Sequence, residues 1–230
     1  MYVVLFKLAK FTEIYELTSK YCKKMNIDHY FLYCDETISE DTLVDGNIIR
    51  FKMKENNWHS LLIKVIGAFN ICKDKNYDKI MVFNVSTFVN LPILSNILTY
   101  TNVSCLSNIG YDYKFKDTIY NFPSGAGFIM DISVVKNICK FFNDNKYIVN
   151  NKFSTEFDEN FPTTDDIFFG YYFHMNNIKI TKLNRHSIIS VDHVVSPNIN
   201  AYPHVRVKTF SDEMDLKHFR KLVLDNYGCS

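Results

Sequence analysis

Short apolar runs alternate with amphipathic segments through the first half of the chain. Runs of apolar, β-branched and aromatic residues predict strands in Met1–Leu8, His29–Cys34 and Asn47–Met53. Apolar residues at helical spacing predict helices over Phe11–Met25 and Trp58–Lys73. Strands that alternate with helices in this way indicate an α/β fold, a Rossmann-like and mostly parallel sheet flanked by helices.

The stretch Lys79–Asn90 is the most informative part of this pattern. Its continuous apolar run, Ile80–Phe83, predicts a strand that is buried on both faces of the sheet. The run ends at the small polar residues Asn84 and Ser86. Ligands of open α/β sheets bind where such strands end, so both side chains are expected at a ligand site. On an extended segment they would point to the same side.

The second half of the chain contains a larger polar fraction and more turn-forming residues. Helices are predicted over Leu91–Tyr100, Ile132–Phe142, Thr163–Met175 and Asp215–Asp225. Strands are predicted in Asn102–Leu106, Phe128–Met130, Ile178–Leu183 and Pro203–Lys208. Loops are predicted over Lys114–Pro123, Asn143–Asn160 and around Arg185 and His186. No internal repeat or linker interrupts the pattern, so a single domain is expected.

Composition limits the classes of protein to consider. The 230 residues are 47% hydrophobic and 16% aromatic, which is typical of a globular protein. A net charge of +1 argues against a nucleic-acid partner held by phosphate neutralisation. The six cysteines form no C-x-x-C pair, which favours reduced thiols in a cytoplasmic protein. No stretch approaches the roughly 20 apolar residues of a membrane span, so a soluble, intracellular protein is expected. Abundant Asn, Ile and Lys indicate an AT-rich genome, for example a viral one.

Four stretches resemble, in order, the motifs of one family. Glu55–Lys64, ENNWHSLLIK, resembles the E-x-Y-x-N-L-T-x-K segment of the fringe and β-1,3-galactosyltransferase family, and FNVSTFVN stands where that family has D-D-D-x-F-x-N. Ser124–Val135 resembles its S-G-G-G-Y-V-L-S-x-D-V-V segment, and Thr164–Gly170 its E-D-V-x-x-G segment. The resemblance implies a GT-A glycosyltransferase. Residues 1–110 would bind the nucleotide sugar and residues 111–230 the acceptor.

The chain departs from the family at the D-x-D motif. In the family, these two carboxylates hold Mn²⁺ or Mg²⁺ on the donor diphosphate. The corresponding residues here are Asn84 and Ser86, which are neutral and poor ligands for a hard cation. Two alternatives follow: a metal-independent enzyme whose cationic side chains stabilise the diphosphate, or a catalytically inactive GT-A-like protein that binds a sugar or nucleotide sugar.

Cationic residues for the first alternative lie in the C-terminal part. In the strand-like segment PHVRVK, His204, Arg206 and Lys208 point to the same side, and Arg185 lies upstream. A guanidinium can bind phosphate oxygens with two parallel hydrogen bonds, and a lysine supplies a point charge. In metal-dependent family members a histidine of the C-terminal part completes the metal shell. The resemblance gives that role to His204 if a metal ion is used.

The resemblance also implies a catalytic base. The Asp of E-D-V activates the acceptor hydroxyl in the family, and it corresponds to Asp166, with Asp165 as the neighbouring alternative. The dipole of the predicted helix would keep this carboxylate ionised, as a general base for an inverting displacement requires. A plainer alternative is an ordinary helix start, with Thr164 as the cap and acids in the first turn.

Further residues are candidates for substrate contacts. Candidate donor contacts are Asn84, Ser86, Asp35, Glu55 and Lys64. The backbone of Ser124, Gly125, Ala126 and Gly127 is a candidate for close approach to a sugar, or else a tight turn. Trp58 is interpreted as a core residue in preference to an acceptor platform. Taken together, these residues predict a hexosyl- or pentosyltransferase that moves a sugar from a nucleotide-sugar donor to a glycan hydroxyl.

Overall fold

Eight strands form the central sheet of the computed structural model, in the order β13-β7-β10-β5-β1-β2-β4-β3. The structure describes residues 1–10, 12–56, 59–145, 148–149, 152–153, 162–190, 201–209 and 211–227. The strands are β1 (Tyr2–Lys7), β2 (Asp28–Cys34), β3 (Thr42–Asp45), β4 (Ile48–Phe51), β5 (Lys79–Asn84), β7 (Cys105–Ile109), β10 (Pro123–Asp131) and β13 (Ile180–Lys182). Strand β10 is antiparallel to both of its neighbours, whereas β5, β1, β2 and β4 run parallel to one another.

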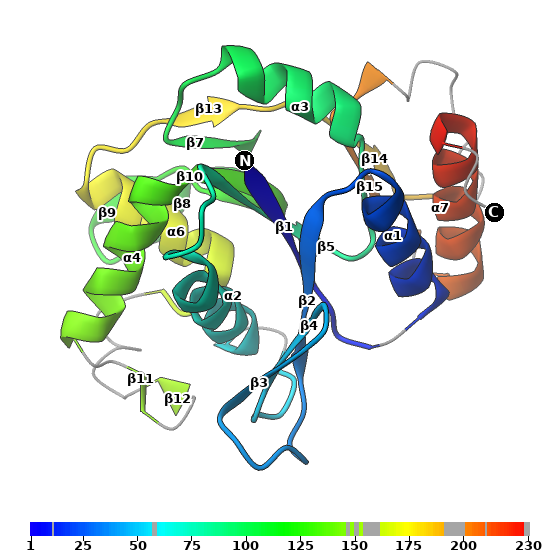
Figure 1. The fold of residues 1–230 in the computed structure, drawn as a ribbon. Helices are drawn as coiled ribbons and strands as arrows, with labels where there is room; N and C mark the ends of the chain where they lie inside the picture. Colours follow the sequence, from blue (N-terminus) through cyan, green and yellow to red (C-terminus); the bar gives the residue numbers. More distant parts are fainter. Residues whose placement is uncertain are drawn as a thin grey trace.

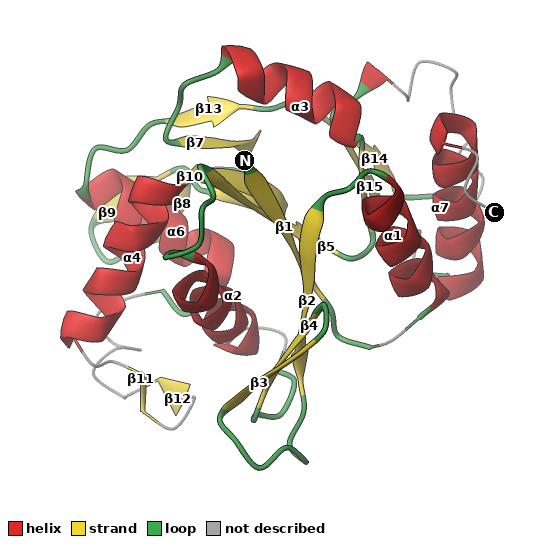
Figure 2. Cartoon of the chain, viewed as in Figure 1, coloured by secondary structure: helices red, strands yellow, loops and turns green. Residues whose placement is uncertain are grey.

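Helices cover both faces of this sheet (Figure 1). The helices on one face are α2 (His59–Cys72), α4 (Ile132–Asn145) and α6 (Asp165–Met175). Those on the other face are α1 (Glu13–Lys24), α3 (Leu91–Tyr100) and α7 (Asp212–Tyr227). Figure 2 shows the strands enclosed between these two helical layers. Each layer shares one apolar cluster with the sheet, so the described residues form one α/β domain, as the sequence predicts.

Smaller sheets are attached to this core. A three-stranded sheet, β14-β15-β6, consists of β14 (Arg185–Ile188), β15 (His204–Val207) and β6 (Thr87–Val89). Strand β6 of this sheet follows β5 in the chain, after a turn at Val85 and Ser86. Two hairpins complete the described strands: β8 (Tyr113–Phe115) with β9 (Thr118–Tyr120), and β11 (Ile148–Val149) with β12 (Lys152–Phe153).

The register of the central strands brings distant segments to one edge of the sheet. In the parallel pairing of β1 with β5, Lys7 lies opposite Asn84. In the antiparallel pairing of β10 with β5, Gly127 lies opposite Phe83. The carboxyl ends of β1 and β5 therefore meet the first half of β10, which is the edge where α/β sheets bind ligands.

Several predictions about local structure are confirmed and three are wrong. The predicted strands of the first half and the helix Leu91–Tyr100 are present. The predicted loop Lys114–Pro123 contains most of the β8–β9 hairpin, and the predicted loop at Arg185 is strand β14. Ser124–Gly127 is not a turn before a strand but part of β10, where the register with β7 shifts. Trp58 and much of the predicted loop 143–160 lie outside the described residues.

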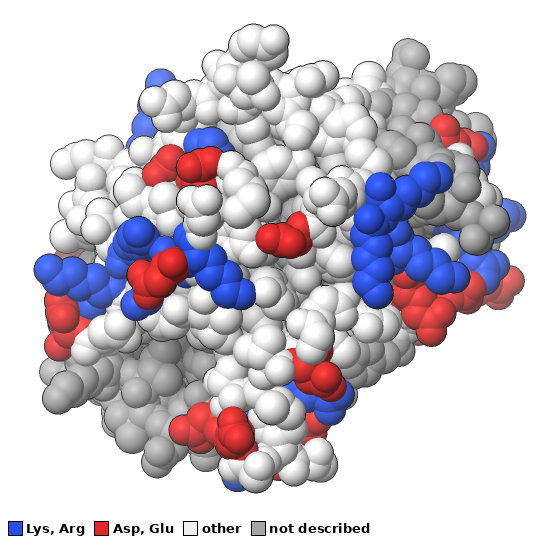
Figure 3. All heavy atoms as spheres, in the orientation of Figure 1, with Lys and Arg blue, Asp and Glu red and all other residues white. Residues whose placement is uncertain are grey.

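The surface carries both signs of charge. On the face shown in Figure 3, Lys and Arg side chains gather over α1 and border acidic side chains, so neither sign dominates that face. No helix in the described part of the chain is long and apolar enough to cross a membrane.

Candidate active site

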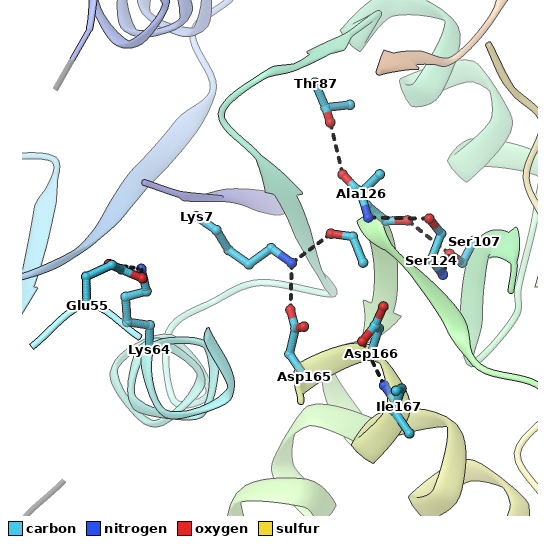
Figure 4. A network of polar contacts seen from close by, with 12 residues as sticks. Lys7, Glu55, Lys64, Thr87, Ser107, Ser124, Ala126, Asp165, Asp166 and Ile167 are labelled. Carbon is cyan, nitrogen blue, oxygen red and sulfur yellow. Dashed lines mark hydrogen bonds and ion pairs between the residues drawn. The ribbon is translucent and has the colours of Figure 1, made fainter. Parts of the chain in front are cut away.

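A buried ion pair lies at the carboxyl edge of β1 (Figure 4). Lys7 Nζ donates to Asp165 Oδ2 at 2.6 Å and to the carbonyl oxygen of Gly125 at 2.7 Å. The Lys7 and Asp165 side chains are 2% and 3% exposed. One ammonium group therefore joins β1, β10 and the first turn of α6. Sequence reasoning missed Lys7, although a lone lysine that ends the apolar run YVVLFK is a visible signal.

Asp166 lies next to this pair, in the first turn of α6. Its Oδ1 accepts a hydrogen bond from the Ile167 N–H at 3.0 Å. Burial, and secondly the negative charge of Asp165, raise the pKa of Asp166 from 3.8 to about 6, while Lys7 opposes the shift. The expected effect of the helix start is outweighed by desolvation, but a carboxylate with this pKa is still mostly ionised at pH 7. A carboxylate with a pKa near 6 is a stronger base than an ordinary aspartate.

Gly125 forms the surface against which Asp166 rests. A Cβ atom added at Gly125 would lie 2.7 Å from Asp166 Oδ2. The absence of a side chain at this position is thus what admits the carboxylate. Gly127 has a different role, since a Cβ there would lie 2.1 Å from Cδ1 of Phe83 in the core. The two glycines of SGAG are explained by two different neighbours.

Hydroxyl groups fix the irregular part of β10. Ser107 Oγ accepts from the Ser124 N–H at 2.9 Å and lies 2.9 Å from the carbonyl oxygen of Gly127. Thr87 Oγ1 donates to the carbonyl oxygen of Ala126 at 3.1 Å. These bonds replace strand pairing where the register shifts. The plain alternative for the next element, an ordinary helix start, also fits: Thr164 is the N-cap residue of α6 and Asp165 and Asp166 lie in its first turn, although the Thr164 side chain makes no capping bond in the described region.

Two arginines lie on the three-stranded sheet, and one of them reaches Ser124, the residue before Gly125. Arg185 Nη1 donates to Ser124 Oγ. Arg206 lies on the adjacent strand β15. Arg185 pairs with His204, and Arg206 is two residues after His204, so both arginines lie on the same face of the three-stranded sheet. Burial, and secondly the charge of Arg206, lower the pKa of Arg185. Within the described residues neither guanidinium has an ion pair with an acid.

His204 is buried between these arginines and the core. Its ring lies 5.6 Å from the Phe83 ring, and neither ring nitrogen has a hydrogen-bond partner among the described residues. Burial and the charge of Arg185 lower its pKa to about 3, so the imidazole is neutral at pH 7.

The residues at this edge do not fit the D-x-D metal site of the fringe and β-1,3-galactosyltransferase family. Asn84 and Ser86 carry no charge, and His204 lies beside the cationic Arg185. No group of three or more His, Cys, Asp or Glu side chains is placed to hold a metal ion in the described ranges. A Mn²⁺ or Mg²⁺ site of the D-x-D type would therefore lack both carboxylates and face a neighbouring positive charge.

Asn84 and Ser86 lie at the expected edge, with a changed geometry. Both are half-buried at the end of β5. The prediction that they share one side assumed an extended segment, but the chain turns at Val85 and Ser86. The turn is held by the Val85 N–H, which donates to Lys7 O at 3.1 Å, and by the Val207 N–H, which donates to Ser86 O at 3.0 Å. Lys208 follows β15 and is exposed.

Glu55 and Lys64 form a second buried pair near the end of β1. Lys64 Nζ donates to Glu55 Oε2 at 2.8 Å and to Leu8 O at 3.2 Å, and the lysine side chain is fully buried. The pair lies on the α2 side of Lys7 (Figure 4). The pair holds the chain that follows β1 in place. The Glu55 carboxylate remains partly exposed.

Asp35 lies farther along the same edge, after β2. Its Oδ1 accepts from Thr37 Oγ1 at 2.6 Å and from the Thr37 N–H at 3.0 Å. Its Oδ2 accepts from Arg50 Nη1 at 3.1 Å. The hydrogen bonds from Thr37, followed by Arg50, lower the pKa of this carboxyl. Asp35 thus stabilises its own loop and does not join the group around Lys7.

Comparisons with known proteins give distant structural likenesses. No protein-family model matches the chain. The chain is similar to a glycosyltransferase involved in the glycosylation of the major capsid of PBCV-1, at 11% identity over 95% of this chain and 98% of that chain, with a TM-score of 0.48. It is also similar to the inositol-1-phosphate CTP transferase from T. maritima, at 10% identity over 99% and 97% of the chains, with a TM-score of 0.49. A Drosophila β-1,4-galactosyltransferase 7 mutant, in complex with manganese, UDP-Gal and xylobiose, matches at 12% identity over 79% and 64% of the chains, with a TM-score of 0.35. These likenesses concern overall shape, and what the site can do follows from its own residues.

Proposed function

We propose that this chain is a GT-A-type glycosyltransferase that moves a hexosyl or pentosyl group from a nucleotide-sugar donor to a glycan hydroxyl without a metal ion. The observation that carries the proposal is a carboxylate with a raised pKa against Gly125 and, bonded to the preceding Ser124, one of two arginines without an acidic partner in the described residues. A base on one side and an anion-binding group on the other are what a single displacement requires.

In the proposed reaction the acceptor hydroxyl attacks the anomeric carbon of the donor. Asp166 takes the proton of that hydroxyl as the new glycosidic bond forms, with inversion at carbon. The bond to the donor diphosphate breaks, and its electron pair remains on the phosphate oxygen. Arg185 and Arg206 stabilise that negative charge. Lys208, which directly follows β15, adds a further positive charge. Lys7 and Asp165 position the base.

The neutral Asn84 and Ser86 favour a second candidate, a GT-A-like protein that binds nucleotide sugars without turnover. In both candidates residues 1–110 supply most of the nucleotide side, and residues 111–230 supply the acceptor side together with the arginines.

A turnover experiment distinguishes the two candidates. The protein is incubated in EDTA with UDP-, GDP- and dTDP-sugars, with and without a panel of methyl glycosides, and nucleoside diphosphate release is measured. Release that increases with a glycoside and is lost in Asp166→Asn supports the enzyme. Asp212→Asn, an exposed acid at the start of α7, is the matched control. Binding without release in the wild type would support the binding protein, and release that persists in Asp166→Asn would contradict the assigned base.

A further inference from the structure

An aromatic cluster covers the β8–β9 hairpin and the adjacent side of α6. Tyr113 and Tyr120 face each other across the hairpin, with ring centroids 5.9 Å apart. Tyr171 of α6 lies 5.6 Å from the Tyr120 ring and 5.4 Å from the Phe115 ring. Tyr111, which is 71% exposed, lies 5.1 Å from the Phe122 ring at the base of the hairpin. None of these rings has a part in the proposed chemistry.

The cluster has a buried layer and an accessible layer. Tyr120 is 4% exposed and forms the buried layer, on which the rings of Tyr113 and Tyr171 pack. Tyr113, Phe115 and Tyr171 are half-buried, so each presents part of a ring to solvent. The Tyr120 hydroxyl is buried and has no hydrogen-bond partner among the described residues. A buried hydroxyl without a partner is uncommon in a finished core.

The cluster lies close to the proposed base. Tyr120 ends β9 three residues before β10 begins, and Ser124 and Gly125 follow at once. Burial raises the pKa of Tyr120, and the charges of Tyr113, Tyr171 and Asp166 add to that shift. Asp166 is therefore near enough to act on the Tyr120 hydroxyl electrostatically. Figure 1 shows the hairpin beside α6.

The hairpin lies away from Asp35, one of the candidate nucleotide contacts. It connects β7 with β10, whereas Asp35 follows β2, three strands beyond β10 in the sheet order. Polar groups accompany the rings: Asn121 Nδ2 donates to Asp112 Oδ1, and both side chains are exposed. Sugar sites combine apolar surface for the C–H face of a pyranose with a few placed polar groups for its hydroxyls.

We propose that the β8–β9 hairpin and Tyr171 form the acceptor subsite, where rings of Tyr113, Phe115 and Tyr171 bind the apolar face of a pyranose and direct one of its hydroxyls to Asp166. This inference rests on the proposed function for its second part. The binding itself does not require turnover, which allows the two to be tested separately.

The experiment measures glycoside binding directly. Saturation-transfer NMR titrations use the methyl glycosides of galactose, glucose, mannose and xylose with the full chain in the absence of donor. We expect at least one glycoside to bind the wild type, and Tyr171→Ala to weaken it at least about tenfold. Tyr171→Phe, which keeps the ring, should bind within about twofold of the wild type. Tyr100→Ala, which removes an 89% exposed tyrosine on α3, is the matched control and should leave binding unchanged.

Phe115→Ala on the hairpin provides a second variant in case Tyr171→Ala does not fold, and it should also weaken binding about tenfold. Wild-type affinity in folded Tyr171→Ala or Phe115→Ala would overturn the proposal, as would the absence of binding by every glycoside of the panel. A chain that binds glycosides through these rings but releases no nucleotide from any donor would contradict the proposed function and leave the subsite intact.

Discussion

The two charged groups at the carboxyl edge of the sheet differ in how their charge is balanced. Lys7 and Asp165 neutralise each other in a buried ion pair that also holds the backbone of Gly125. Arg185 and Arg206 lie at diagonal positions on one face of a small sheet, and no acid in the described residues balances them. Two neighbouring cations in a partly buried place are unfavourable unless an anion joins them.

This difference divides the site into an acid half, made of Lys7, Asp165 and Asp166, and a cationic half, made of Arg185 and Arg206. The charges of Lys7 and Asp165 balance each other in the core, so folding alone sets the geometry of the acid half. In the proposed function the cationic half takes an external anion, and a diphosphate matches guanidinium geometry. The following predictions test this division, from the largest expected effect to the smallest.

Asp166→Asn should lower kcat for glycosyl transfer by about 10³-fold, because the amide cannot accept the proton of the attacking hydroxyl. Steady-state kinetics with saturating donor and acceptor measure the effect. Affinity for the nucleoside diphosphate, measured by calorimetry, should stay within about twofold, because Asp166 lies on the acid half. A variant with nearly wild-type kcat would remove Asp166 from the mechanism.

Lys7→Met should lower the free energy of unfolding by about 3–5 kcal/mol, because Asp165 would remain as a buried charge without a partner. Urea denaturation measures the loss. Lys10→Met is the matched control: its pair with Asp212 is exposed, and its removal should cost no more than about 1 kcal/mol. The double variant Lys7→Met/Asp165→Leu should be more stable than Lys7→Met alone. Equal losses at Lys7 and Lys10 would show that the buried pair has no special role.

Gly125→Ala and Gly127→Ala should separate activity from stability. The new methyl group at position 125 meets the movable carboxylate of Asp166, so kcat should fall about 10- to 100-fold with little change in stability. The methyl group at position 127 meets the Phe83 ring, and overpacking should lower the free energy of unfolding by about 1–3 kcal/mol. Kinetics and urea denaturation of both variants test the contrast, and an unchanged kcat in Gly125→Ala would contradict the positioning of Asp166.

The pH dependence follows from the raised pKa of Asp166. Activity should rise with pH through about 6, as the base loses its proton. Stability should change in the opposite sense: the ordinary pKa is 3.8, so between 3.8 and about 6 the folded state holds a proton that the unfolded state has lost. Above pH 6 the folded chain carries the full cost of a buried charge. Asp166→Asn should thus be the more stable chain at pH 7–8, with the difference shrinking as the pH falls to 4 in thermal denaturation. A difference that grew on acidification would contradict the shift.

The sequence predicted the framework better than the site. Continuous apolar runs identified β1, β2 and β5, because a strand buried on both faces leaves no polar positions. The β8–β9 hairpin was missed because its rings alternate with exposed polar residues, and only cross-strand pairs of rings explain its stability. Strand β14 was missed because its partner, β15, lies sixteen or more residues away, beyond any local pattern.

The family resemblance proposed Asp166 as the base and residue type proposed the arginines, but neither predicted the environment of these side chains. The order of the motifs placed Asp166 and Gly125 in one site, and the structure brings them into contact. The direction of the Asp166 pKa shift depends on burial and on Asp165, which a helix-start pattern does not contain. Lys7 contacts residues more than a hundred positions away, so no spacing rule could assign its role.

The central claim is that Arg185 and Arg206 bind a diphosphate without a metal ion. Calorimetric titration of UDP, GDP and dTDP in EDTA tests it most directly. The wild type should bind at least one diphosphate without a divalent ion, and Arg185→Met and Arg206→Met should each weaken it about 10- to 100-fold. Arg220→Met, which removes an exposed arginine that pairs with Glu13, should have no effect. Binding that requires Mn²⁺, or that is unchanged in both Arg185→Met and Arg206→Met, would contradict the account.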